Sequence, residues 1–108
     1  MKVNIVDIGK DYSRYPAGRF AGDGPFSGER FREEVLLPCL RRGEMLQVCL
    51  DNTAGYGSSF LEEAFGGLIR QGIPQADVNR LLSFVTEDSA LEAEINGYID
   101  DEAQRRHA

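Results

Sequence analysis

A nearly unbroken apolar run, Met45-Leu46-Gln47-Val48-Cys49-Leu50, lies near the middle of the chain. Its length is that of one strand, and its lack of polar alternation is typical of a strand covered on both faces. We therefore expect it to be the central strand of a sheet. A small polar segment follows, and then an amphipathic pattern with apolar residues at Phe60, Leu61, Ala64, Phe65, Leu68 and Ile69. This pattern predicts a helix, which Gly72 would cap and Pro74 would follow.

The N-terminal part of the chain adds a strand and a helix before this unit. Residues Val3 to Ile8 are short and β-branched, which predicts a first strand. Residues 10–26 carry several glycines, prolines and aromatics, so we expect a structured loop or an irregular hairpin there. Ser27 is a suitable N-cap for a helix over about 28–42, in which Pro38 would cause a kink or an early end.

Three further elements are expected towards the C-terminus. A short helix is predicted from Pro74 to Leu82, and Ser83 to Thr86 has the character of a strand. A last helix begins with the capping box Ser89-Ala90-Leu91-Glu92. Residues 100–108 are strongly charged, and we expect this tail to fray.

The order of these elements predicts an α/β fold with a small, mainly parallel or mixed sheet and helices packed on it. The chain has 108 residues. This length is sufficient for one compact domain and too short for two, so residues 1–108 are expected to form a single domain.

Composition excludes several classes of protein. A hydrophobic content of 42% and a charged content of 28% are ordinary for a water-soluble globular chain. No apolar run approaches the roughly 20 residues of a membrane span, and the N-terminus lacks the apolar core of a secretory signal, so we expect a cytoplasmic protein that binds no membrane. The net charge of −6 and the pI near 4.7 oppose binding to the nucleic-acid backbone.

Groups suited to catalysis or metal binding are few. Cys39 and Cys49 lie among apolar neighbours, as structural thiols do. The only histidine, His107, lies in the charged tail, where it is a poor base or metal ligand. Adjacent carboxylates such as Glu62-Glu63 are expected to lie on solvated helix faces. We therefore predict that the chain is not an enzyme and holds no metal or cofactor.

The strongest site candidate is the turn between the central strand and the following helix. Open α/β sheets place ligand sites at such strand ends, and N–H groups at a helix N-terminus favour anions. The alternative is a tight structural turn. The candidate loop residues are Asp51, Asn52, Thr53, Gly55, Tyr56, Gly57, Ser58 and Ser59. Ser59 and Glu62 fit a capping box, which leaves Ser58 as the better functional candidate.

Two other features concern packing or partners. Glycine inside a helix costs about 1 kcal/mol relative to alanine, so the Gly66-Gly67 pair indicates either close approach of another backbone, of this chain or of a partner, or packing against a strand of this chain. The aromatics Phe20 and Phe26, with Arg19, are candidates for a partner surface or for a lid over the core. Glu62 and Glu63 are added to that candidate surface.

A resemblance to a known family rests on the loop and on two longer strings. A strand, Asp51, a small polar loop and Gly57 to Leu61 entering a helix resemble the Asp-Ser-Ser-Gly region of STAS domains, the fold of anti-sigma-factor antagonists. The segments Gly18–Phe20 and Asp23–Glu34, together with Thr53–Leu68, resemble the bacterial STAS-like family labelled a domain of unknown function. The resemblance covers nearly the whole chain.

This resemblance implies a STAS-like fold and a regulatory domain that binds a partner protein. In STAS antagonists, a loop serine is phosphorylated by a partner kinase with a histidine-kinase-type ATPase fold, and the mark ends binding. Carried over, the phosphoacceptor would be Ser58, with Ser59 as the second choice. A phosphate on Ser58 would lie at the positive end of the helix and would act by repelling the partner.

A second hypothesis belongs to another class of function. The chain would be a small-ligand module that holds a nucleotide or another phosphorylated molecule at the N–H groups of residues 57–60, with Arg19 as the counter-ion. Saturable nucleotide binding that is lost in Gly57→Val would favour this hypothesis over a protein-interaction domain.

Overall fold

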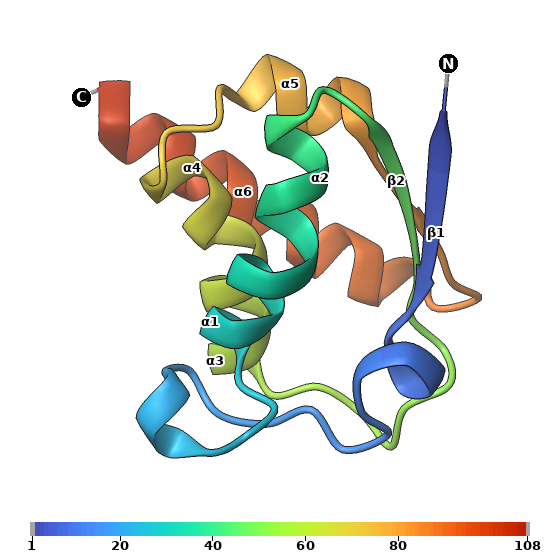
Figure 1. Cartoon of the computed structure of the whole chain (residues 1–108). Helices are drawn as coiled ribbons and strands as arrows, with labels where there is room; N and C mark the ends of the chain where they lie inside the picture. Colours follow the sequence, from blue (N-terminus) through green and yellow to red (C-terminus); the bar gives the residue numbers. More distant parts are fainter. Residues whose placement is uncertain (1, 108) are drawn as a thin grey trace.

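Three short strands form the sheet of the computed structural model, which describes residues 2–107 (Figure 1). His107 is described by its backbone alone, so the expectation for its side chain lies outside the described residues. The strands are β1 (Val3–Asp7), β2 (Met45–Cys49) and β3 (Leu82–Val85). They pair in the order β1-β2-β3, and both pairings are parallel. The predicted α/β class and the central position of β2 are confirmed.

Two long helical segments connect the strands. The first comprises α1 (Gly28–Phe31), the π-helical η3 (Arg32–Leu36) and α2 (Leu37–Arg41) without a break. Ser27 caps it, as predicted, by accepting a hydrogen bond from Arg30 N. The helix continues past Pro38 because the wide π turns of η3 come immediately before the proline, which occupies the first turn of α2.

The second segment comprises α3 (Ser58–Leu61), the π-helical η4 (Glu62–Gly66) and α4 (Gly67–Arg70). It ends as predicted at Gly72, whose φ is 95°. Gly72 N donates to Ile69 O and Ile73 N donates to Leu68 O, the two bonds of a Schellman motif. The short helix α5 (Gln75–Leu81) follows, with Pro74 at its N-cap.

The last helix, α6 (Ser89–His107), differs from its prediction at both ends. Asp88 rather than Ser89 is the cap, because Asp88 Oδ1 accepts a hydrogen bond from Leu91 N. The helix also continues through the segment expected to fray. Glu102 and Ala103 are buried there, and Arg70 Nη1 lies 2.7 Å from Glu102 Oε1. The charge of the tail thus serves to hold it against α4.

The segment over residues 10–26 contains no hairpin. The π-helical turn η1 (Ile8–Tyr12) directly follows β1, and the 3₁₀ turn η2 (Ala21–Asp23) lies further along. The rest is an irregular loop held to α1 by Gly28 N, which donates to Gly18 O, and by Glu29 N, which donates to Arg19 O. The prediction of a structured loop is therefore the correct one of the two.

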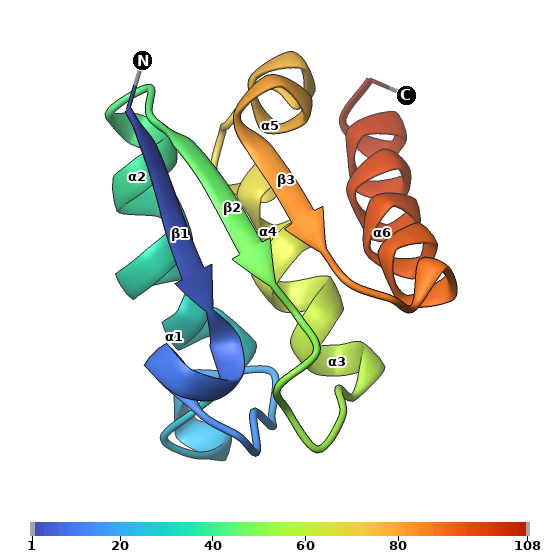
Figure 2. The ribbon, with the colours of Figure 1, turned by 90° about the vertical axis from the view of Figure 1, so that its right-hand side faces the viewer.

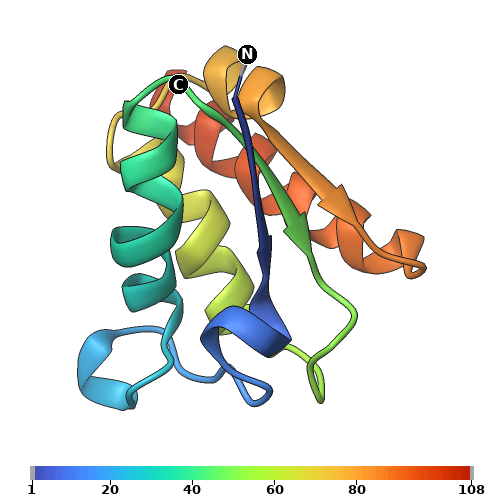
Figure 3. The same cartoon turned by 45° about the vertical axis from the view of Figure 1, so that its right-hand side comes forward.

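All helices of the described chain lie on one face of the sheet (Figures 2 and 3). On this face Val48 contacts a core that includes the aromatic rings of Phe31, Phe60 and Phe65, all fully buried. The opposite face is open, with Val3, Ile5 and Val85 exposed by 50%, 66% and 44%. The expectation that β2 is covered on both faces is therefore wrong, because a sheet wound in the sequential order β1-β2-β3 receives helices on one side only.

Candidate functional site

The candidate loop, residues 51–59, leaves the carboxyl end of β2 and includes Ser58 and Ser59, the first two residues of α3. It lies between two other segments at the same end of the sheet, the η1 turn after β1 and the link from β3 to α6 (Figure 2). The sheet order has no reversal, so the crevice that such reversals create in open α/β sheets is absent from the described chain. The site has to be understood from its own contacts.

Asp51 ties the loop to the link between β3 and α6. Its Oδ1 accepts a hydrogen bond of 2.5 Å from Thr86 Oγ1, and its Oδ2 accepts one of 2.8 Å from Glu87 N. The Thr86 hydroxyl and, after it, the Glu87 amide hold the pKa of the Asp51 carboxyl below its ordinary value. Asp51 therefore acts as an ionised anchor of this corner.

On the other side the loop is tied to the β1–η1 corner. Asn52 Nδ2 donates to Asp7 Oδ2 at 2.5 Å. A Cβ on Gly9 would overlap the carbonyl oxygen of Asn52, so only glycine permits this approach. Ala54 N donates to Arg14 O at 2.8 Å, which adds a third tether.

Tyr56 fixes the loop from inside. Its hydroxyl donates to the carbonyl of Leu50 at 2.7 Å, and its ring lies 5.9 Å from that of Phe60. Burial raises the pKa of Tyr56, so the phenol stays protonated and keeps donating. The loop backbone is thus held by side chains at several points rather than being a free coil.

Ser58 and Ser59 are exposed at the start of α3. Gly57 is the N-cap and no side chain caps this helix, so the predicted capping box of Ser59 and Glu62 is wrong. Glu62 is instead paired with Arg19 and Arg70, at 2.5 and 2.6 Å. Neither hydroxyl therefore caps α3, and sequence spacing does not decide which of the two serines is the better functional candidate. Ser58 differs in lying near the hydroxyl of Tyr98, whose pKa is nevertheless raised, chiefly by its hydrogen bond to Glu94.

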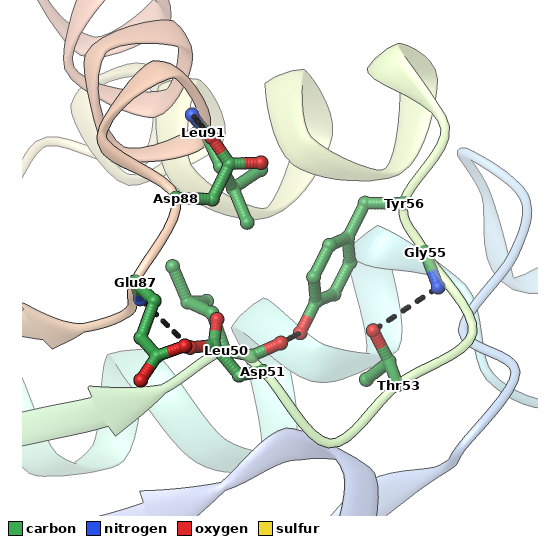
Figure 4. Close-up of a pocket in the computed structure, with 8 residues that line it drawn as sticks. All are labelled: Leu50, Asp51, Thr53, Gly55, Tyr56, Glu87, Asp88 and Leu91. Atoms are coloured by element: carbon green, nitrogen blue, oxygen red, sulfur yellow. Dashed lines mark hydrogen bonds between the residues drawn. The ribbon is translucent and has the colours of Figure 1, made fainter.

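A cavity of about 520 Å³ lies between the candidate loop and the link that leads into α6 (Figure 4). It brings together the loop residues Asp51, Thr53, Gly55 and Tyr56 with Leu50, Glu87, Asp88 and Leu91. Its charged lining consists of carboxylates alone, those of Asp51, Glu87 and Asp88. Such a cavity favours a cation or a hydrogen-bond donor and disfavours a phosphate. Nevertheless, no group of three or more His, Cys, Asp or Glu among residues 2–107 is arranged to hold a metal ion.

The expected partner surface is divided by the structure. Phe20 and Phe26 are exposed by 53% and 39%, so they are accessible to a partner. Glu63 is buried, however, and pairs with Arg32 at 2.5 Å, while Arg19 contacts both Glu62 and Glu63. The expectation that Glu62 and Glu63 form a solvated face is wrong because Arg19 and Arg32 reach them from other segments and Arg70 reaches them from the last turn of the same helical segment.

Sequence reasoning missed this ion network, which joins Arg19, Arg32 and Arg70 to Glu62, Glu63 and Glu102. The one sequence feature that pointed to this network was the Gly66-Gly67 pair within a helix. A Cβ on Gly67 would overlap the guanidinium of Arg32, and one on Gly66 would lie 3.4 Å from Tyr98 O of α6. Gly66 therefore admits the backbone of α6, which is one of the two predicted alternatives, Gly67 admits a buried arginine, and neither packs against a strand.

The two cysteines occupy different environments. Cys39 is buried and accepts a weak hydrogen bond from Asn4 Nδ2 at 3.3 Å, whereas Cys49 is half-buried on the open face of the sheet. Neither sulfur has a base or a second thiol among its hydrogen-bond partners within residues 2–107.

One layer of helices on a small parallel sheet, with a tethered loop at the carboxyl end of the central strand, defines a STAS-like α/β domain. The chain belongs to the family described as STAS-like domain of unknown function (DUF4325), whose model matches residues 27–92. That range holds α1 to β3 and the candidate loop and ends in the first turn of α6. No curated protein and no solved structure matches the chain. No helix within residues 2–107 is long and apolar enough to cross a membrane.

Proposed function

We propose that this domain is a non-catalytic regulatory module of the cytoplasm that binds a partner protein through residues 52–59 and the start of α3. The observation that carries this proposal is the exposure of Ser58 and Ser59 on a loop whose backbone is held at several points. A held loop loses little conformational entropy on binding, so it favours association. An exposed serine without a capping bond is also accessible to a kinase.

Phosphorylation of Ser58 is proposed to switch this binding off. A phosphate adds about −1.5 to −2 charges and would lie at the N-terminal end of the helical segment 58–70, where the helix dipole favours anions. The modification should therefore leave the fold intact and act on the partner. The resemblance to STAS antagonists supports a histidine-kinase-type ATPase as that partner, with Ser58 as acceptor and Ser59 as the second choice.

The geometry gives less support to a module for nucleotides or other phosphorylated ligands. The cavity beside the loop is lined by three carboxylates, which repel phosphate. Arg19, the expected counter-ion, already contacts Glu62 at 2.5 Å. Calorimetry with ATP tests this alternative, since saturable binding that is lost in Gly57→Val would restore it.

A pull-down from the source organism tests the interaction and its switch together. Wild type, Ser58→Asp, Ser59→Asp and Ser89→Asp serve as baits, with bound proteins and phosphoserine identified by mass spectrometry. Ser89 is the matched control, because it is an exposed serine at the first position of another helix. We expect a histidine-kinase-type ATPase to be captured by wild type and Ser89→Asp, and to be lost with Ser58→Asp.

The outcomes separate the parts of the proposal. Loss with Ser59→Asp but not with Ser58→Asp would move the acceptor to Ser59. Equal capture by all four baits would refute the serine switch. Unfolding of Ser58→Asp, seen by circular dichroism, would refute the view that the charge acts on the partner rather than on the fold.

A further inference from the structure

Helix α6 runs beside β3, one of the two edge strands of the sheet (Figure 2). A second groove lies between them. Its volume is about 520 Å³. On one side it is lined by Leu82, Ser83 and Phe84 of β3. It shares no lining residue with the cavity beside the candidate loop. The groove is therefore a separate feature of the molecule.

Helix α6 presents one polar stripe to this groove. Glu92, Asn96 and Asp100 line it, and they recur at intervals of four residues, which places them on one helix face. Asn79 of α5 completes the polar lining. No lysine or arginine is among the lining residues, so the only charges facing the groove are two carboxylates.

The edge of β3 offers unpaired backbone groups to the same groove. Val85 O accepts a hydrogen bond from Leu50 N, so the N–H and C=O of Val85 point towards β2. Because this direction alternates along a strand, the N–H and C=O of Phe84 and the C=O of Leu82 point away from β2. Leu82 N is already used, since it donates to Val78 O. The open edge thus offers one donor and two acceptors.

We propose that this groove binds an extended, basic segment of another protein, which adds to the sheet as a fourth strand beside β3. Main-chain hydrogen bonds to Phe84 and Leu82 would supply affinity, as in other strand-addition complexes. Glu92 and Asp100 select lysine or arginine side chains on the side of the segment that faces α6, by charge complementarity. The amides of Asn79 and Asn96 can hydrogen-bond to polar groups between them. This site is distinct from the loop proposed above and goes beyond it.

Peptide selection tests the site whichever protein supplies the segment. The whole chain is panned against a display library of random twelve-residue peptides, and the enriched peptides are synthesised and measured by calorimetry. We expect enriched sequences with two lysine or arginine residues four positions apart, which matches the spacing of about 12 Å between Glu92 and Asp100 along α6, and with no proline between them. A lack of enrichment, or enrichment of acidic or proline-rich sequences, would overturn the proposal.

Variants locate the binding on the molecule. Asn96→Trp fills the groove and should abolish binding of the enriched peptides. The double variant Glu92→Gln/Asp100→Asn should weaken it about three- to tenfold at low salt, as expected for exposed charges. Asp101→Asn is the matched control, because Asp101 is an exposed carboxylate of the same helix outside the groove, and it should bind as wild type.

Amide exchange tests the backbone geometry directly. In the free protein the amide of Phe84 should exchange faster than those of Ser83 and Val85, and it should become protected when peptide binds. Unchanged exchange at Phe84 in the complex would overturn strand addition. Ser58→Asp should bind the peptides normally, so failure of the loop proposal and failure of this one are distinguishable.

Discussion

The guanidinium of Arg32 lies in the space left by the absent side chain of Gly67. A Cβ at position 67 would overlap Arg32 Nη1 and lie 3.1 Å from Arg32 Cδ. Arg32 is held there, because Nη1 donates to Glu63 O at 2.9 Å and to Glu63 Oε2 at 2.5 Å, and its side chain is only 4% exposed. A glycine in a helix and a buried arginine on its neighbour thus depend on each other.

Gly67→Ala should therefore destabilise the protein, although alanine favours helix. We expect a loss of about 1–3 kcal/mol from overpacking against a guanidinium that two hydrogen bonds to Glu63 hold in place. Gly97→Ala is the control, since Gly97 lies within α6 and a Cβ there meets nothing within 4 Å. That variant should gain up to about 1 kcal/mol from helix propensity. Urea unfolding measures both, and the same sign for the two variants would contradict this account.

The Arg32–Glu63 pair should show strong coupling. Glu63→Gln leaves a buried guanidinium without its main partner and should cost about 3–5 kcal/mol. Arg32→Met should cost less, because Glu63 keeps contacts with Arg19 and Arg70, each at 3.3 Å. The double variant Arg32→Met/Glu63→Gln should be more stable than the sum of the two single losses implies, by about 0.5–3 kcal/mol in a double-mutant cycle. Simple additivity would show that the pair is not energetically coupled.

Glu62 should make the stability sensitive to acid. Burial tends to raise its pKa, but hydrogen bonds from Arg70 and Arg19 outweigh this and lower the pKa below the ordinary 4.5. A carboxyl with a lowered folded-state pKa stabilises the fold fully above its unfolded pKa and loses that contribution as pH falls through the folded value. Unfolding free energy should therefore drop below about pH 4.5, and the drop should be smaller in Glu62→Gln. An identical pH profile for the variant would refute this role.

The framework of the fold was predictable because its signals are local. The apolar run of β2, the periodicity of the segment 58–70 and the stop at Gly72 each lie within a few residues, and each is confirmed. The charge network was not predictable in the same way. Glu62 and Glu63 are adjacent in sequence, and Arg70 lies two turns further along the same helical segment, but only the tertiary fold brings Arg19 and Arg32 to them from other segments.

The same dependence on contacts between distant residues explains why the capping box at the candidate loop was wrongly predicted and why its acidic cavity was not predicted. Local spacing pairs Ser59 with Glu62, yet Arg70 and Arg19 compete successfully for that carboxylate. Four residues of the candidate loop, Asp51, Thr53, Gly55 and Tyr56, line one cavity. This acidic cavity, however, needs Glu87 and Asp88 from the next strand-to-helix link, which parallel pairing of β2 and β3 brings to the same end of the sheet.

Tyr98 should ionise unusually late. A hydrogen bond of 2.5 Å to Glu94 Oε2, followed by burial, raises the pKa of Tyr98 to about 12. An absorbance titration should show this phenol ionising near pH 12, with the signal assigned by its loss in Tyr98→Phe. Glu94→Gln should lower the pKa towards 10, because the main cause of the shift is removed. Ionisation near pH 10 in the wild type would exclude the Glu94 contact.

Tyr56→Phe should loosen the candidate loop while preserving its packing. The ring can still contact Phe60, but the buried carbonyl of Leu50 loses the hydroxyl that donates to it at 2.7 Å. An unsatisfied buried acceptor costs about 1–3 kcal/mol, which urea unfolding should detect. Tyr15→Phe is the control, since Tyr15 is 68% exposed and its removal of a hydroxyl should change stability by less than about 0.5 kcal/mol. Amide exchange in residues 52–57 should accelerate in Tyr56→Phe alone, and affinity for the partner should fall with it because the loop must then be ordered on binding. Equal stability and equal exchange in the two variants would show that the Tyr56 hydroxyl does not hold the loop.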